Sequence, residues 1–176
     1  VRSRRQRQMC IRDSINTAII TIIAQNFGAK NLLRIKQTYL TAIKYAFVIM
    51  ILSSLLVYSL AELLTGLFST DLNVIEFGKL YLQISAFVLP AYPVFFLSNG
   101  FFMALKKSEK ALIANVFRNV IFPFLVFYTA VFYNSNFENF FWLWVIYNWI
   151  FSLSYLGYTF FYLNFKLDKF STVVKP

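Results

Sequence analysis

Four long apolar stretches limit what this chain of 176 residues can fold into. Each is longer than the roughly 20 residues that an α-helix needs to cross the hydrocarbon core of a bilayer. Spanning strands are excluded because they are about ten residues long and alternate in character, whereas these stretches are apolar on every face. We therefore predict an all-α integral membrane protein, a multi-pass helical bundle with complete transmembrane helices over 41–64, about 80–105, 111–132 and 140–163.

The first 14 residues differ from the rest in their charge. They contain five arginines, and residues 4–13, RRQRQMCIRD, match codon by codon the in-frame translation of a transposon-end adapter used for sequencing libraries. We interpret residues 1–14 as an adapter-derived artefact rather than as a basic arm that binds anionic lipid or signals topology. The apolar residues 15–27 that follow are too short to span a membrane, so we expect them to be the truncated end of a helix.

Composition narrows the chemistry that the chain can perform. Removing residues 1–14 takes away five arginines and one aspartate, lowers the net charge from +10 to +6, and removes Cys10, the one cysteine of a chain without histidine. Disulfides, thiol chemistry and histidine-based metal sites or general bases are then excluded, so we predict no enzyme activity, no metal site and no bound cofactor. With 59% hydrophobic and 14% charged residues, the chain fits a lipid bilayer better than a nucleic-acid partner.

The charges between the apolar stretches alternate in sign. Lysines and arginines gather in 28–44, in 106–110 and in the tail 166–176, whereas the connections 62–76 and 134–138 are acidic. By the positive-inside rule, the basic connections and the C-terminus are cytoplasmic and the acidic connections face outward. Four complete spans return the chain to the side on which it starts, which agrees with this orientation.

Polar side chains inside the apolar stretches are the candidate functional residues, because burying them in lipid is costly. Arg118 lies about seven residues into its stretch, with Asn115 and Asn119 close by in sequence. One interpretation is that Arg118 extends to the cytoplasmic surface. The other is that these three residues face a hydrated cavity, where Arg118 meets an anionic group.

Prolines interrupt two of the stretches. Pro90 and Pro93, in VLPAYPVF, predict a bend near the middle of the second complete helix, and Pro123 repeats this feature in the next helix. Bent helices at the midplane of the membrane mark substrate sites or hinges in transporters, and a packing kink without a ligand is the alternative. The polar candidates on the bent helix are Gln83, Tyr92 and Asn99.

Two connections carry turn signals. Gly28 and Ala29, in FGAKN, predict a cytoplasmic turn between helices, because small residues let a helix stop and the backbone bend. In the acidic connection, Gly66 predicts the end of one helix, and a cap among residues 69–71 predicts a short surface helix that leads into the next span.

Several segments together resemble the multidrug and toxic compound extrusion (MATE) transporters. AIITIIAQNFGAKNLLRIKQTY contains a Gly-Ala turn, LFSTDLNVIEFGKLYLQI an acidic outer loop before a Tyr-Leu helix start, and FFMALKKSEKALIANVFRNVIFPFLVFY a basic turn followed by Arg118 and Pro123. The resemblance implies twelve helices in two six-helix lobes, with this chain running from the end of helix eight to helix twelve. Residues 15–165 would form the transmembrane domain, residues 166–176 a cytoplasmic tail, and the N-terminal lobe would be missing from this chain.

The same resemblance implies a secondary active transporter of a bacterial inner membrane that exports cationic or amphipathic compounds in exchange for H⁺ or Na⁺. Aromatic residues in a central cavity would accept flat hydrophobic cations, and the candidates are Tyr92, Phe95, Phe96 and Phe101. Every acidic residue after residue 14 lies at or beyond the end of an apolar stretch, so the chain departs from family members with an acid in the tenth helix. We expect the ionisable coupling group in the missing N-terminal lobe.

Two alternatives remain open. One is a related flippase that moves a lipid-linked oligosaccharide or peptidoglycan precursor, which would favour several cationic residues in the cavity to meet a pyrophosphate. Arg118 is the one such residue visible in the sequence. The other is an integral-membrane enzyme or a non-transporting subunit, which the absence of histidine and of buried acids disfavours.

Overall fold

The computed structural model describes the backbone of residues 3–133 and 136–166 and the side chains of residues 16–133 and 136–165. Within these residues every regular element is helical, which confirms the predicted all-α class. In chain order the elements are α1 (Ser3–Gly28), α2 (Leu32–Gly66), α3 (Leu72–Ala86), α4 (Ala91–Ala104), α5 (Ser108–Val116), the π-helical η1 (Phe117–Ile121), α6 (Phe122–Phe132), α7 (Phe137–Phe161) and the π-helical η2 (Tyr162–Lys166).

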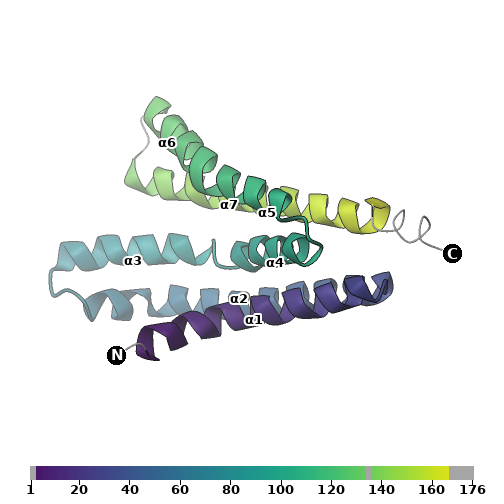
Figure 1. The fold of residues 1–176 in the computed structure, drawn as a ribbon. Coiled ribbons are helices and arrows are strands. Elements are labelled where there is room, and N and C mark those ends of the chain that lie inside the picture. Colours follow the sequence, from purple (N-terminus) through teal and green to yellow (C-terminus); the bar gives the residue numbers. More distant parts are fainter. Residues whose placement is uncertain (1–2, 134–135, 167–176) are drawn as a thin grey trace.

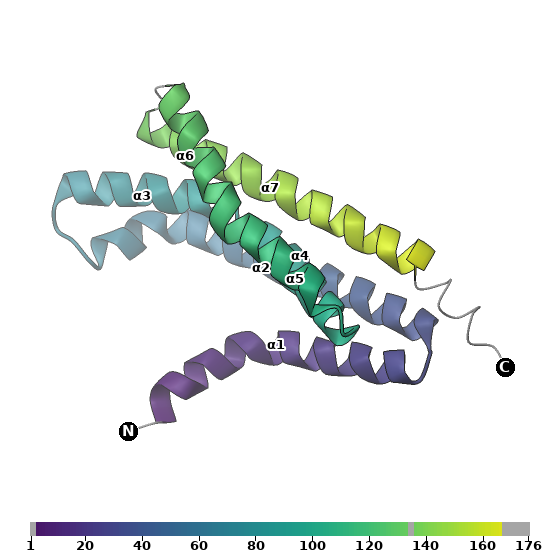
Figure 2. The ribbon, with the colours of Figure 1, turned by 45° about the horizontal axis from the view of Figure 1, so that its top comes forward.

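Helix α4 lies at the centre of the bundle. It packs against α1, α2, α5 and α7 and carries much of the buried core, including Phe95, Phe101 and Phe102. Figure 1 shows α1 and α2 on one side of the α3–α4 layer and α5, α6 and α7 on the other. Helix α6 packs against α7, whereas α5 packs against α4 and diverges from α7 (Figure 2). This divergence leaves space between α5 and α7.

The predicted transmembrane architecture is confirmed. Helix α3 and helix α4 together form one apolar segment that is bent by 49°, and three further helical segments are long and apolar enough to cross a membrane, namely Leu32–Gly66, Ser108–Phe132 and Phe137–Phe165. Large hydrophobic side chains are exposed along these segments, among them Leu55, Leu56, Phe124 and Phe127. Such extensive exposed apolar surface is expected of helices that face lipid rather than water.

The acidic connection is built differently from the prediction in one respect. Helix α2 ends at Gly66 as predicted, and Asp71 caps the next helix by accepting a hydrogen bond from the Asn73 amide at 2.9 Å. The capped helix is α3, the first half of the bent segment, and not a separate surface helix. The charge of Lys79 interrupts the apolar stretch, so the sequence did not indicate that the capped helix belongs to the bent segment. In the structure the Lys79 ammonium group pairs with the Glu62 carboxylate at 2.7 Å.

The predicted bend lies at residues 87–90, directly before α4. Pro90 has no amide hydrogen, so it cannot donate to the Ala86 carbonyl as a continuous α-helix would require. The backbone there tightens into successive i to i+3 hydrogen bonds, the last of them from the Tyr92 amide. Pro93 follows in the first turn of α4, where a missing amide hydrogen removes no intrahelical bond.

Side chains of two neighbouring helices pair with carbonyl groups at the bend. The indole N–H of Trp149, on α7, donates to the Phe87 carbonyl oxygen at 2.9 Å. The hydroxyl of Ser54, on α2, donates to the Ala86 carbonyl oxygen at 2.7 Å. Lipid offers no water to a freed backbone group, so a broken helix needs such partners. The bend is therefore fixed by α2 and α7 together.

Both basic turns have the same helix-ending geometry. Each turn is a Schellman motif, in which two successive backbone amides donate hydrogen bonds to carbonyls of the last helical turn. The first of the two amides belongs to Lys30 after α1 and to Lys106 after α4. Both lysines have left-handed backbones, with φ of 56° and 57°. The turn lies where Gly28 and Ala29 predicted it, but the left-handed residue is Lys30, and Gly28 still belongs to α1. A cation at this position interacts favourably with the carbonyl end of the helix.

Replacing Lys106 by glycine is expected to stabilise the protein, because a left-handed backbone costs an L-residue about 1 kcal/mol and costs glycine almost nothing. The measurement is the fraction of a fluorescent fusion that remains monodisperse after heating. The matched control is Lys107→Gly, since Lys107 has a negative φ and its ammonium group lies 5.1 Å from the centre of the Tyr162 ring. Equal or lower stability for Lys106→Gly would contradict the prediction.

The basic turns and the end of α7 gather at the same end of the bundle (Figure 1). Lys36 at the start of α2 donates to the Asn164 side chain at 2.8 Å, and Lys110 at the start of α5 donates to the Tyr158 hydroxyl. The acidic connection between α2 and α3 lies at the opposite end (Figure 1). The alternation of charge along the sequence therefore becomes a separation of charge in space.

The backbone of α1 extends through residues 3–14, but the side chains of residues 1–15 lie outside the described part of the protein. The interpretation of residues 1–14 as adapter-derived therefore stays a prediction. Residues 167–176, the larger part of the predicted cytoplasmic tail, also lie outside the described residues.

Candidate functional site

A cavity of about 380 Å³ lies where α4, the α5–α6 segment and α7 meet. It contains seven of the residues that the sequence singled out, together with aromatic and amide side chains from α6 and α7. The lining residues are Tyr92, Phe95, Phe96, Asn115, Arg118, Asn119, Phe122, Pro123, Trp144 and Asn148. Its volume is within the range of small-molecule sites in proteins.

Arg118 and Asn119 are carried by the π-helical turn η1. The Phe122 amide donates to the Phe117 carbonyl, five residues earlier, instead of to the usual position four residues earlier. Pro123 follows at once and has no amide hydrogen, so the helix cannot continue in regular α geometry past this point. Wide turns of this kind occur often at functional sites, and here the wide turn belongs to the cavity wall.

The Arg118 guanidinium lies against aromatic rings of α4. Its central carbon is 4.1 Å from the ring centre of Phe95, 4.8 Å from that of Tyr92 and 5.8 Å from that of Phe96. These distances are within the range of cation–π attraction. The residue is half-buried and lines the cavity, with its guanidinium held against these rings.

One side chain on α7 orients the arginine. The Asn148 carbonyl oxygen accepts a hydrogen bond from Arg118 Nη2 at 3.3 Å, while its amide nitrogen donates to the Trp144 carbonyl at 2.9 Å. Asn148 is buried, with 3% of its surface exposed. Since a guanidinium has five N–H donors, the other donors of Arg118 are available to the cavity. Arg118 is the one charged residue among the described lining residues.

The other predicted positions fall into two groups. One group lines the cavity and comprises Tyr92, Phe95, Phe96, Asn115, Asn119 and Pro123. Gln83 is half-buried on α3 and does not line it. The remaining predicted residues are buried in the packing of the bundle, namely Pro90, Pro93, Asn99 and Phe101. The side-chain carbonyl oxygen of Asn99 accepts a hydrogen bond from the Tyr155 hydroxyl at 3.1 Å.

Sequence reasoning missed three lining residues, Phe122, Trp144 and Asn148. A signal existed for Asn148, because an amide inside an apolar stretch is as costly in lipid as the asparagines beside Arg118. No such signal existed for Phe122 or Trp144. Aromatic residues occur throughout these helices, and only the packing decides which rings face the cavity.

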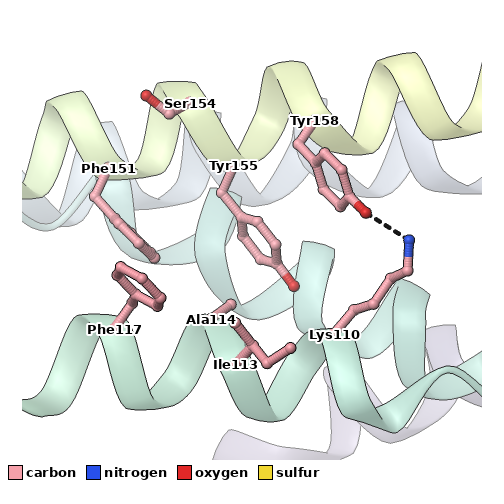
Figure 3. Close-up of a pocket in the computed structure, with 8 residues that line it drawn as sticks. All are labelled: Lys110, Ile113, Ala114, Phe117, Phe151, Ser154, Tyr155 and Tyr158. Atoms are coloured by element: carbon pink, nitrogen blue, oxygen red, sulfur yellow. Dashed lines mark hydrogen bonds between the residues drawn. The ribbon is translucent and has the colours of Figure 1, made fainter.

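A second cavity of about 310 Å³ occupies the space between the diverging α5 and α7 (Figure 3). At its basic end Lys110 donates a hydrogen bond to the Tyr158 hydroxyl, and its ammonium group lies 4.4 Å from the centre of the Tyr162 ring. The rest of the wall is largely apolar, and Figure 3 shows Phe117 and Phe151 facing each other at the far end. Phe151 also packs against Phe95 and Phe122, so it separates the two cavities.

Comparison with known protein families identifies the family of this chain. The MatE family model matches residues 9–129, which is more than half of the chain. The chain belongs to the MATE family. MATE proteins are transporters, and the apolar helices described above make this MATE protein a multi-pass membrane protein.

Solved structures share the MATE fold at low sequence identity. A MATE protein in complex with MaL6 has a TM-score of 0.80 and 20% identity, over 88% of this chain and 35% of that one. A MOP superfamily transporter from Pyrococcus furiosus, described as having a binding pocket of reverse polarity that suggests a different function, has a TM-score of 0.78 and 22% identity, over 84% and 34%. An outward-facing multidrug resistance MATE transporter of the MOP superfamily has a TM-score of 0.79 and 21% identity, over 88% and 34%.

The MATE chain described here therefore spans about a third of the length of these structures. No curated protein sequence is similar enough to match it. The prediction of a MATE-type helical membrane fold is confirmed, and the substrate and the coupling ion remain to be proposed from the cavity.

Proposed function

We propose that the chain is part of a secondary active transporter that exports cationic or amphipathic small molecules in exchange for H⁺ or Na⁺. The observation that carries this proposal is the cavity around Arg118, in which aromatic rings and amide groups converge beside a bent helix and a π-helical turn. Aromatic walls with a few polar groups hold flat amphipathic compounds by burial of apolar area. Nothing in this arrangement positions a nucleophile or a general base, so binding and release is the chemistry that it supports.

Two irregular points in the helices beside the cavity could act as hinges for alternating access. The α3–α4 bend and the η1 turn are places where backbone geometry departs from a regular α-helix, and both adjoin the cavity through Tyr92 and Arg118. In transporters such discontinuities lie at substrate sites, where a lobe can open to either side of the membrane. We place the basic end of the bundle and the C-terminus on the cytoplasmic side of a bacterial inner membrane, from the positive-inside rule.

The coupling ion needs an ionisable group that this cavity does not supply among its described lining residues, since none of them is acidic. Proton or sodium relays within membranes normally use a carboxylate. We therefore propose that an N-terminal lobe, joined to this chain in the complete transporter, provides the coupling carboxylate and the second wall of the substrate site.

The proposal is tested by producing the full-length gene in a host that lacks its major efflux pumps and measuring the retention of ethidium and rhodamine B. Energised cells are expected to retain less of at least one dye than cells with an empty vector, and an uncoupler is expected to abolish the difference. Unchanged retention of both dyes in energised cells would refute export. Dependence of export on added sodium would identify Na⁺ as the coupling ion, and dependence on the proton gradient alone would identify H⁺.

The flippase alternative draws its support from one observation, the position of Arg118 in the cavity. A lipid-linked pyrophosphate would favour several cations, whereas the described lining residues supply one. Vesicles containing the full-length protein and a fluorescent lipid-linked phosphate distinguish the two functions, because only a flippase moves the lipid between leaflets.

A further inference from the structure

We propose that Arg118 is a subsite for a carboxylate or another anionic group on the substrate. This lobe would then select amphipathic compounds that combine an aromatic body with an anionic group over simple organic cations. The inference rests on the proposed transport function, because it names the substrate class of the same cavity.

The side chain of Arg118 is incompletely paired. Its guanidinium is half-buried at a depth where a charge is costly, and the bond to Asn148 is the one hydrogen bond that its side chain makes within the described residues. The one ion pair among those residues joins Lys79 and Glu62, at the other end of α3. A charge held away from water without a counterion is strongly unfavourable. An anionic ligand would supply the counterion and form charge-assisted hydrogen bonds with the guanidinium.

Arg118 already occupies the aromatic faces that a cationic ligand would need. Cation–π recognition requires the face of a ring, and the guanidinium lies over Phe95 and Tyr92 at 4.1 and 4.8 Å from their ring centres. An organic cation would have to displace the guanidinium or lie next to it. Two positive charges a few ångströms apart repel each other, and the repulsion is stronger in a site of low dielectric.

The rest of the cavity wall suits the aromatic body of such a compound. Phe122 and Trp144 add apolar aromatic surface to the same cavity, so a flat ring system can be buried beside the arginine. Asn119 lines the cavity one residue after Arg118 and provides an amide within the same turn. The arrangement therefore offers a charged donor at one point and apolar surface around it.

A matched pair of ligands tests the inference. Rhodamine B carries a free carboxylate, and its ethyl ester has the same aromatic cation without that carboxylate. Binding of both dyes to the full-length transporter in nanodiscs is measured by fluorescence anisotropy at neutral pH, with empty nanodiscs subtracted. The wild-type protein is expected to bind rhodamine B at least about tenfold more tightly than the ester, which is the size expected for a hydrogen bond to a charged group.

Variants assign this preference to the arginine. Arg118→Gln is expected to weaken rhodamine B binding by about tenfold or more and to leave ester binding unchanged or tighter, whereas Arg118→Lys retains part of the preference because it keeps the charge and loses the bidentate geometry. Arg34→Gln is the matched control, because Arg34 is exposed at the start of α2 and remote in sequence from η1. It is expected to bind both dyes as the wild-type protein does.

Equal affinity for the two dyes, or tighter binding of the ester, in the wild-type protein overturns the inference, and this comparison holds even if Arg118→Gln does not fold. The inference also fails if Arg118→Gln folds and keeps the preference, because a group other than Arg118 then recognises the carboxylate of rhodamine B. Binding preference without export in cells would refute the proposed function and leave the subsite intact. Export in cells together with equal affinities for the two dyes would support the proposed function and refute the anionic subsite.

Discussion

Replacing Gly100 by leucine is expected to separate α1 from α4 and to leave little folded protein. A Cβ atom at position 100 would clash with Asn16 Oδ1 and would lie 3.2 Å from Cγ1 of Ile20, both on α1. The remaining leucine atoms have no space at a position that is fully buried in the centre of the bundle. Helices in membranes associate mainly through close packing, so overpacking this contact should cost about 1–3 kcal/mol or more.

The matched control for this experiment is Gly157→Leu. Gly157 also lies inside a helix, α7, but nothing lies within 4 Å of an added Cβ, and the position is exposed. The measurement is the yield of monodisperse protein from fluorescence-detected size-exclusion chromatography. Gly100→Leu is expected to lose most of the monodisperse peak and Gly157→Leu to keep it. Similar profiles for the two variants would show that α1 does not pack on α4 at this point.

A second glycine variant refines the result. Gly100→Ala is a smaller change, and its Cβ clashes with the end of the Asn16 side chain alone, with Ile20 Cγ1 next at 3.2 Å, so the additional substitution Asn16→Ala is expected to restore stability. The Oδ1 atom of Asn16 is buried without a hydrogen-bond partner among the described residues, so its removal also relieves an unpaired polar group. Failure of the double variant to recover would place the cause of the loss elsewhere than in the α1–α4 contact.

The Trp149→Phe substitution is expected to produce the second large effect, because it leaves the Phe87 carbonyl at the helix bend without its indole donor. An acceptor left unsatisfied away from water costs about 1–3 kcal/mol, and lipid provides no replacement for the lost donor. The aromatic volume is largely retained, so the loss reports on the hydrogen bond. Adding Ser54→Ala, which removes one of the two donors to the Ala86 carbonyl and leaves the Leu89 amide as the other, is expected to deepen the loss.

Trp142→Phe is the control for this prediction. Trp142 is on the same helix, and its ring packs against Phe87 with centres 5.6 Å apart, but its N–H makes no hydrogen bond within the described part of the chain. The temperature at which half of a fluorescent fusion loses its monodisperse peak is expected to fall clearly for Trp149→Phe and only slightly for Trp142→Phe. An equal fall for both would mean that ring packing, and not the carbonyl bond, stabilises the bend.

The features that the sequence predicted are those set by local chemistry. Pro90 removes one amide hydrogen wherever the helix lies, so the bend could be placed without any knowledge of its neighbours. Gly66 and the cap expected among residues 69–71 marked the end of α2 and the start of α3 for similar reasons. The turn at Gly28 was located correctly, whereas the sequence made no prediction of its left-handed residue, because φ at Lys30 follows from how α1 and α2 are joined.

In the candidate site, too, local chemistry selected residues, whereas packing decided which of them line the cavity. Arg118, Asn115 and Asn119 could be selected because polar groups are rare and costly in apolar helices, and their proximity follows from the spacing of one helix. Gln83 and Asn99 met the same criterion, yet one is on α3 away from the cavity and the other is bonded to Tyr155 in the core. A helix that is apolar on every face does not reveal which face is buried, so rotation about its axis cannot be read from its sequence.

By itself, the sequence determined that this protein is a bundle of membrane-spanning helices, where those helices bend and stop, and which end is basic, because hydropathy, proline geometry and charge act within one segment of chain. Only the tertiary structure decided that Asn148 would hold Arg118, that Trp149 would cap the bend and that rings of α4 would cover the guanidinium. These contacts join residues on different helices, and their positions depend on how each helix is rotated and packed against its neighbours.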